Sequence, residues 1–219
     1  MIPPTRLERM ALADLPALET LTGVEQLFLT RTPLADASPL AALTRLRVLG
    51  LKLTRVADVT PLGALRRLES LNLSFTPVAD VGGLAGLTGL RSLYLTGSLV
   101  ADASPLAALT GLTRLDLGGT AVADLAPLRG MTGLLSLQLS STRVTDLSPL
   151  AGLKALQVLE LADTAVSDLS PLARMPDLRW LDIRNTRVAD PTMPRLMRCK
   201  VLTDKTVARR HDRTPATRQ

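Results

Sequence analysis

A unit of 22 residues repeats without interruption through most of the chain, and it limits the possible folds more than any other feature of the sequence. The unit that starts at Leu46 ends at Arg67, and Leu68 begins the next one. Self-similarity at one fixed period indicates a structure in which each unit packs against its neighbours. The first position of the unit recurs at Val24, Leu46, Leu68, Leu90, Leu112, Leu134, Leu156 and Leu178.

The first part of each unit has the pattern of a strand. Leu49 and Leu51 flank Gly50, and such alternation of apolar residues is the period of a β-strand. A strand this short cannot bury its apolar face alone, so successive copies are predicted to pair as a parallel sheet above a continuous core. We predict strands at 27–29, 49–51, 71–73, 93–95, 115–117, 137–139, 159–161 and 181–183.

The second part of each unit has the pattern of a short helical return. Pro61 suits the first turn of a helix, where its missing N–H is not needed, and Leu62 and Leu65 lie three residues apart on one face. Few residues are available, so we predict one turn of 3₁₀ or α-helix per unit. The predicted fold is an α/β, right-handed solenoid with eight short parallel strands on the concave face and these short helical segments on the convex side.

Two polar residue types also recur in every unit. A Thr or Ser follows each strand, and its hydroxyl can hydrogen-bond the backbone of the turn. An Asp precedes each return segment, where a carboxylate can cap the turn. A metal-binding ladder is the alternative, but calcium-binding repeats need several carboxylates and a Gly-rich turn in each unit. The hydroxyl column is Thr32, Thr54, Thr76, Ser98, Thr120, Thr142, Thr164 and Thr186, and the Asp column is Asp14, Asp36, Asp58, Asp80, Asp102, Asp124, Asp146, Asp168 and Asp190.

The residues beside the repeats are predicted to close the two ends of the core. Residues 1–203 are predicted to form one solenoid, with the repeats at 24–190. Residues 1–23 would supply an N-terminal cap and a half repeat, including a short helix at 6–11. The repeat pattern fails after the last Asp, so residues 191–203 are predicted to be a C-terminal cap without a strand, because terminal repeats must be closed off.

Residues 204–219 are polar and basic, without a pattern, and are predicted to be a disordered tail. Residues 191–219 hold eight Lys or Arg and two Asp, which accounts for the whole net charge of +6. The basic and acidic residues of 1–190 cancel, so the high pI gives no information about a partner of the repeats. The tail could contact nucleic acid or acidic lipid, but its cations are not interleaved with aromatic residues, and no nucleic-acid partner is expected.

The sequence shows no pattern of an active site. The one cysteine, Cys199, excludes an intramolecular disulfide and fits a reducing compartment, and the one histidine, His211, lies in the tail. No secretory signal is recognised at the N-terminus, and no apolar stretch approaches the roughly 20 residues that cross a membrane. We therefore expect a cytoplasmic monomer that is not an enzyme and has no cofactor, no metal site and no membrane contact.

The strand residues that point away from the core differ from unit to unit, as a recognition surface requires. Three of the four aromatic residues of the chain lie there, and aromatic residues beside Arg are typical of binding hot spots. The competing explanation is that bulky rings do not fit a thin core, and isolated exposed apolar residues are normal. The predicted partner-binding residues are Phe28, Lys52, Asn72, Tyr94, Arg114, Asp116, Gln138, Glu160, Trp180, Asp182 and Arg184.

The segment at 147–172, which reads Leu-Ser-Pro-Leu-Ala-Gly-Leu-Lys-Ala-Leu-Gln-Val-Leu-Glu-Leu-Ala-Asp-Thr-Ala-Val-Ser-Asp-Leu-Ser-Pro-Leu, resembles the leucine-rich repeats of the internalin type. Phosphatase-regulator leucine-rich repeat proteins share this repeat style. The resemblance covers residues 12–190 and implies a concave sheet that binds another protein. A Thr column replaces the more usual Asn ladder, and the signal peptide, helical cap domain and wall-attachment segments of surface-anchored relatives are not recognised.

The function predicted from the sequence is a non-enzymatic protein-binding scaffold that holds a protein or long peptide on its concave face. A bacterial secreted effector or adhesin-type fragment that binds a host protein is the alternative. A third possibility is an enzyme whose chemistry lies in the tail. The sequence identifies neither the partner nor the role of the tail.

Overall fold

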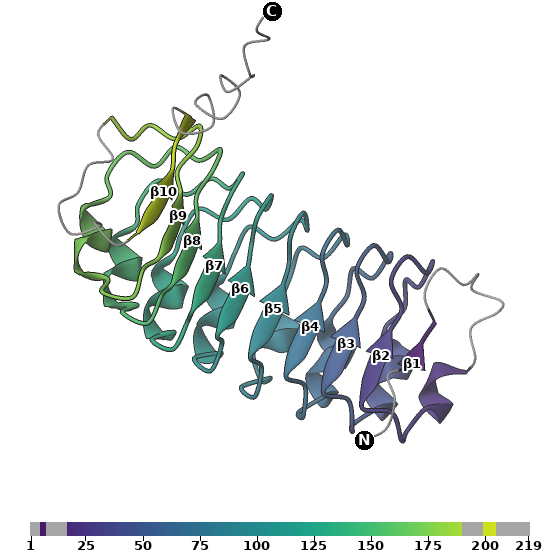
Figure 1. Cartoon of the computed structure of the whole chain (residues 1–219). Helices are drawn as coiled ribbons and strands as arrows, with labels where there is room; N and C mark the ends of the chain where they lie inside the picture. Colours follow the sequence, from purple (N-terminus) through teal and green to yellow (C-terminus); the bar gives the residue numbers. More distant parts are fainter. Residues whose placement is uncertain (1–4, 8–16, 190–198, 205–219) are drawn as a thin grey trace, which may run out of the picture.

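The computed structural model contains one parallel sheet in which ten strands follow each other in chain order (Figure 1). The structure describes residues 5–7, 17–189 and 199–204. Partners in the first nine strands lie 22 residues apart, so that one column of the repeat runs along all of them, whereas Lys200 of the tenth strand pairs with Trp180. The strands are β1 (Thr5–Arg6), β2 (Gln26–Phe28), β3 (Val48–Gly50), β4 (Ser70–Asn72), β5 (Ser92–Tyr94), β6 (Arg114–Asp116), β7 (Ser136–Gln138), β8 (Val158–Glu160), β9 (Trp180–Asp182) and β10 (Lys200–Leu202).

The return segments within the described residues are 3₁₀ turns, and they lie on the side of the coil away from the strands (Figure 1). Six of them carry a proline at the first or second position, as in η4, where Pro61 follows Thr60. The turns are η2 (Leu18–Thr20), η3 (Ser38–Ala42), η4 (Thr60–Ala64), η5 (Gly82–Leu84), η6 (Ser104–Ala108), η7 (Ala126–Gly130), η8 (Ser148–Gly152) and η9 (Ser170–Arg174).

The core lies between the strands and the 3₁₀ turns and consists of stacked aliphatic side chains. Leu49, Leu51, Val56, Leu62 and Leu65 are all buried, and the same positions are buried in the neighbouring repeats. Burial of each such side chain contributes roughly 1.5–3 kcal/mol of gross stabilisation, most of which offsets chain entropy. The predicted inward positions of the repeat are therefore confirmed.

The hydroxyl column is buried and bonds the backbone of its own turn. Thr54 Oγ1 donates to the carbonyl oxygen of Leu51 at 2.8 Å, and the equivalent bond recurs in the other Thr repeats at 2.6–2.8 Å. These bonds satisfy carbonyl groups where the chain leaves each strand, as buried backbone requires. Ser98 breaks the pattern, because its buried Oγ has no hydrogen-bond partner among the described residues.

The Asp column caps the 3₁₀ turns, but from one position further upstream than a standard N-cap. Asp102 Oδ1 accepts the N–H of Ser104, the first residue of η6, at 2.8 Å, while Ala103 is the N-cap residue itself. The same bond forms at Asp36, Asp58, Asp80, Asp124, Asp146 and Asp168, at 2.7–2.8 Å. Each carboxylate therefore satisfies one of the N–H groups that a helical turn leaves free at its start.

One residue in every repeat adopts a left-handed backbone conformation directly before the hydroxyl column. Only Gly97 and Gly119 in this column are glycines, while Leu53 and Phe75 have φ of 60° and 57°. This region is unfavourable for residues with a Cβ, and most of all for bulky ones. The full column is Arg31, Leu53, Phe75, Gly97, Gly119, Ser141, Asp163 and Asn185.

The sheet is longer than the repeat pattern predicts. The eight predicted strands are present, each assigned one residue earlier than expected, but β1 and β10 add a strand at each end. The prediction that no strand follows Asp190 is therefore wrong, and Arg6 lies in a strand rather than in the predicted helix at 6–11. Exposed strand edges explain both additions, because β2 and β9 would otherwise present unpaired backbone groups.

Several predictions concern residues outside the described part of the chain. These are the remainder of the helix at 6–11, the half repeat before Ala17 with Asp14, Asp190 with the first part of the predicted C-terminal cap at 191–198, and the basic tail beyond Asp204 with His211. Among the described residues, no helix is long and apolar enough to span a membrane.

Candidate functional site on the concave sheet face

The predicted partner-binding residues lie on one face of the sheet, because the strands pair in register. Asn72 is paired with Tyr94, and Tyr94 with Asp116, so these three side chains are neighbours across β4, β5 and β6. Arg114 lies two residues before Asp116 on the same face, paired with Ser92 and Ser136. The sequence prediction therefore identifies a contiguous surface, and its role in binding stays a prediction.

The centre of this face has the fewest internal contacts. The Tyr94 side chain is half-buried, and neither a hydrogen bond nor a cation contact to it occurs among the described residues. Arg114 is exposed and has no ion pair in the same part of the chain. Asp116 Oδ1 accepts the backbone N–H of Gly118 at 2.9 Å, and Asn72 Oδ1 accepts that of Ser74 at 2.9 Å, so both side chains are held in place. An aromatic ring, a cation and a carboxylate thus lie on the neighbouring strands β5 and β6 of one face.

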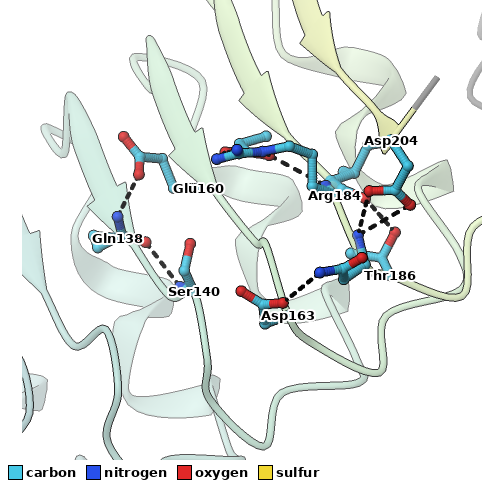
Figure 2. A network of polar contacts seen from close by, with 10 residues as sticks. Gln138, Ser140, Glu160, Asp163, Arg184, Thr186 and Asp204 are labelled. Atoms are coloured by element: carbon cyan, nitrogen blue, oxygen red, sulfur yellow. Dashed lines mark hydrogen bonds and ion pairs between the residues drawn. The ribbon is translucent and has the colours of Figure 1, made fainter. Parts of the chain in front are cut away.

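The C-terminal half of the face is linked by polar contacts (Figure 2). Gln138 donates to Glu160 of the next strand and accepts the N–H of Ser140 at 2.8 Å. Asp182 is 3% exposed and holds Arg184 through two N–H groups, at 2.9 Å to Nε and 2.6 Å to Nη2. These groups already satisfy one another, so a partner has less to gain from them than from the centre.

The Arg184 guanidinium is bound by Asp182, and Arg184 lines one pocket with Asp163 and Asp204. Its pKa is raised, first by the hydrogen bond to Asp182 and then by attraction to the same carboxylate, to Asp163 and to Glu160. Asp204 and Asp163 are joined to this region through Asn185, whose N–H donates to Asp204 at 3.1 Å and whose Nδ2 donates to Asp163 at 2.8 Å. Among the described residues, no group of three or more His, Cys, Asp or Glu could hold a metal ion.

The two aromatic rings at the ends of the face contact cations from the terminal strands. Arg6 Cζ lies 4.7 Å from the centroid of the Phe28 ring, and Lys200 Nζ lies 4.7 Å from that of Trp180. The Phe28 ring also covers Gly50, where a Cβ would lie 2.8 Å from its Cδ1. Both rings therefore help to seal the ends of the sheet, and of the three predicted aromatic residues only Tyr94 lies free of such a cation.

Lys52 lies beside Phe75, an exposed ring that the sequence prediction did not include among the binding residues. Its Nζ lies 5.5 Å from the centroid of the Phe75 ring, which is 50% exposed. Leu53 and Leu99 are the other large exposed apolar residues of the described chain, at 38% and 63%. A signal was available, because Leu53 and Phe75 share the left-handed column with two glycines and an asparagine, where a bulky apolar residue is unexpected.

Proteins of known structure share the architecture of this chain. No protein-family model matches the sequence, and no curated protein matches it. Two solved structures of internalins from Listeria monocytogenes do match. The internalin inlF superimposes with a TM-score of 0.81 at 32% identity, over 85% of this chain and 56% of its own. Internalin C2 (inlC2) gives a TM-score of 0.72 at 31% identity, over 85% of this chain and 74% of its own.

The chain belongs to the internalin-like leucine-rich-repeat proteins. The resemblance seen in the repeats is therefore confirmed, with buried Thr and Ser at the positions of the asparagine ladder. This leucine-rich-repeat chain spans little more than half the length of inlF. The plant peptide hormone receptor RGFR1 shares the fold at 16% identity, with a TM-score of 0.74 over 91% of this chain and 36% of its own.

Proposed function

We propose that the chain is a non-enzymatic scaffold that binds a protein or long peptide on the concave face of its leucine-rich repeats. The observation that carries this proposal is that the buried positions hold the same residue types in every repeat, whereas the positions on the concave face hold different ones. Tyr94, Arg114 and Asp116 form the centre of the binding surface, since among the described residues Tyr94 and Arg114 lack the cation and carboxylate partners that occupy the ends of the face, and Asp116 is held by the Gly118 N–H. RGFR1, whose solved structure is a complex with RGF2, supports the use of this fold for peptide binding.

The length of the face favours a macromolecular partner over a small ligand. Phe28 and Trp180 lie seven strand spacings apart, or about 34 Å at 4.8 Å per strand. A folded partner that covered the centre would meet an aromatic anchor with a polar rim, the usual composition of a protein interface.

The test is an affinity pull-down with the intact chain, followed by measurement of the dissociation constant for the recovered partner. We expect Tyr94→Ala and Arg114→Ala each to weaken binding by about 2 kcal/mol, as hot-spot truncations do. Arg143→Ala is the matched control, because this exposed arginine lies outside the concave rows. Unchanged affinity in both concave variants, together with loss in the control, would show that another surface binds the partner.

The similarity to internalins favours one second candidate, a bacterial secreted effector or adhesin-type fragment that binds a host protein. Export of the full chain into the culture medium of its source organism would support this candidate over a cytoplasmic scaffold. Retention of the chain in the cytoplasm under the same conditions would contradict it.

A further inference from the structure

An arginine-lined groove runs along the edge where the chain enters strands β3, β4 and β5. Its volume is about 630 Å³, and its walls come from the segments that join each 3₁₀ turn to the following strand. Five arginines and two glutamates give the lining a net charge of +3, although residues 1–190 as a whole are neutral. The lining residues are Glu25, Arg45, Arg47, Arg66, Arg67, Glu69, Gly89 and Arg91.

Three of the guanidinium groups are fixed by contacts within the chain. Arg47 binds one carboxylate oxygen of Glu69, through Nε at 3.0 Å and Nη2 at 2.6 Å. Arg66 Nη1 donates to the carbonyl oxygen of Gly86 at 2.7 Å, and Arg91 Nη1 donates to that of Gly111 at 3.0 Å. A guanidinium has five N–H donors, so Arg66 and Arg91 are held in position while most of their donors stay available to a ligand.

The other two arginines have no side-chain partner among the described residues. Arg45 and Arg67 are exposed and occupy the same position of successive repeats. They are therefore separated along the coil by about one strand spacing of 4.8 Å. Two free guanidinium groups beside three fixed ones create a surface that favours anions, and the fork geometry of arginine matches a carboxylate through two hydrogen bonds.

We propose that this arginine-lined groove binds an acidic segment of a partner protein, through the carboxylates of its Asp and Glu residues. The charge of the lining argues for an anionic partner, and its composition argues for a peptide rather than a nucleic acid. Single-stranded nucleic acids bind where bases stack on aromatic rings, and none of Phe28, Phe75, Tyr94 and Trp180 lines the groove. The groove shares no residue with the centre of the concave face, so this proposal is independent of the proposed function.

The primary test is fluorescence anisotropy with a labelled peptide of alternating Glu and Gly and its Gln–Gly counterpart. The full chain should bind the acidic peptide and not the neutral one, and added salt should weaken binding because exposed charges are screened. The double variant Arg45→Glu with Arg67→Glu should bind at least about tenfold more weakly, because it replaces two charge-assisted contacts by repulsion. Arg143→Glu with Arg187→Glu makes the same charge change outside the groove and should keep affinity within about twofold.

A second variant tests the geometry at constant charge. A Cβ added at Gly86 would lie 2.0 Å from Arg66 Nη1, so Gly86→Ala must displace this guanidinium from its carbonyl partner. Gly152→Ala is the matched control, because Gly152 has the same position in its repeat and an added Cβ meets nothing within 4 Å. We expect Gly86→Ala to weaken acidic-peptide binding several-fold and Gly152→Ala to leave it unchanged.

Two results would overturn the proposal. One is equal affinity of the acidic peptide for the unmodified chain and for the Arg45→Glu, Arg67→Glu variant. The other is tighter binding of a single-stranded oligonucleotide than of the acidic peptide at the same salt concentration, which would assign the groove to nucleic acid. Tyr94→Ala should have no effect in this assay, so failure of the concave-face proposal is recognised separately.

Discussion

Lys200 of strand β10 places its Nζ 4.7 Å from the centroid of the Trp180 ring, on the strand that it pairs with. Arg6 of β1 has the same relationship to Phe28 at the other end of the sheet, also at 4.7 Å. Each terminal strand therefore covers two things at once, the backbone edge of the strand beside it and the large ring on that strand. The exposed edge would otherwise be a template for pairing with another molecule.

This contact predicts a measurable coupling between the last two strands. Lys200→Met removes the charge but keeps an apolar stem, and it should lower the free energy of unfolding by about 0.5–1 kcal/mol, as expected for an exposed cation–π pair. The same change in a Trp180→Leu background should cost less, which a double-mutant cycle from urea denaturation detects. Lys154→Met, at an exposed position, is the control. A zero interaction energy in the cycle would show that the ring and the ammonium do not stabilise each other.

The sequence predicted the fold well because its information is periodic. Leu49, Leu51, Val56 and the proline of the return segment recur at fixed spacing, so one unit specifies all of them, and stacking specifies the sheet. β1 and β10 were not predicted this way, since Thr5 and Val201 stand where the paired strands carry Leu27 and Leu181, and only part of the leucine pattern is kept. The choice of 3₁₀ over α-helix was left open, because both are compatible with one short turn.

The candidate sites were less predictable, because they depend on which side chains stacking brings together. The concave rows follow from strand alternation, but the contacts that occupy Phe28 and Trp180 come from the terminal strands. The arginine-lined groove combines different positions of successive repeats, such as Arg45 and Arg66, and these are not adjacent in any single unit. A list of cations in each unit gives no indication that they share one surface.

Removal of the Ser98 hydroxyl is expected to cost no stability, unlike removal of the hydroxyl from a Thr of the same column. The buried Oγ of Ser98 has no partner, whereas Thr120 Oγ1 donates to the carbonyl oxygen of Leu117 at 2.6 Å. Ser98→Ala should therefore be neutral or stabilising, while Thr120→Val, which removes the donor and keeps the shape, should cost about 1 kcal/mol. Thermal or urea unfolding of the two variants measures the difference. Equal losses would mean that the Ser98 hydroxyl finds a partner in solution.

The left-handed column predicts a stabilising substitution at Leu53. Its φ of 60° is unfavourable for leucine, and the equivalent residue of the last repeat is Asn185, at 53°. Asparagine tolerates this region, so Leu53→Asn should raise the free energy of unfolding by about 0.5–1 kcal/mol. Gly119→Ala is the complementary test, because φ there is 67° and an added Cβ meets no atom closer than 3.5 Å. It should lower stability by about 1 kcal/mol through backbone strain alone. A loss of stability in Leu53→Asn together with a gain in Gly119→Ala, each measured by urea titration, would contradict a strained column.

The Asp column predicts a stability that depends on pH in a defined direction. Two hydrogen bonds lower the pKa of Asp102 below its ordinary value of 3.8, one from the Ser104 side chain and one from its backbone N–H. The pKa values of Asp36, Asp58, Asp146 and Asp168 are lowered in the same way. A carboxylate with a lowered folded-state pKa stabilises the fold above the unfolded value, and this contribution is lost as the pH falls through the folded value.

Asp102→Asn and Asp102→Ala isolate one member of this column. Asparagine retains an acceptor oxygen for the Ser104 N–H but does not titrate, so its melting temperature should be close to that of the unmodified chain at neutral pH. Alanine removes the acceptor and should melt lower at pH 7, with the gap to the unmodified chain shrinking as the pH falls below the ordinary value of 3.8 and through the lowered pKa of Asp102. All three proteins share every other aspartate, so differences in melting temperature report Asp102 alone. A gap between the alanine variant and the unmodified chain that stays constant down to the lowest pH would show that the charge of this carboxylate does not stabilise the turn.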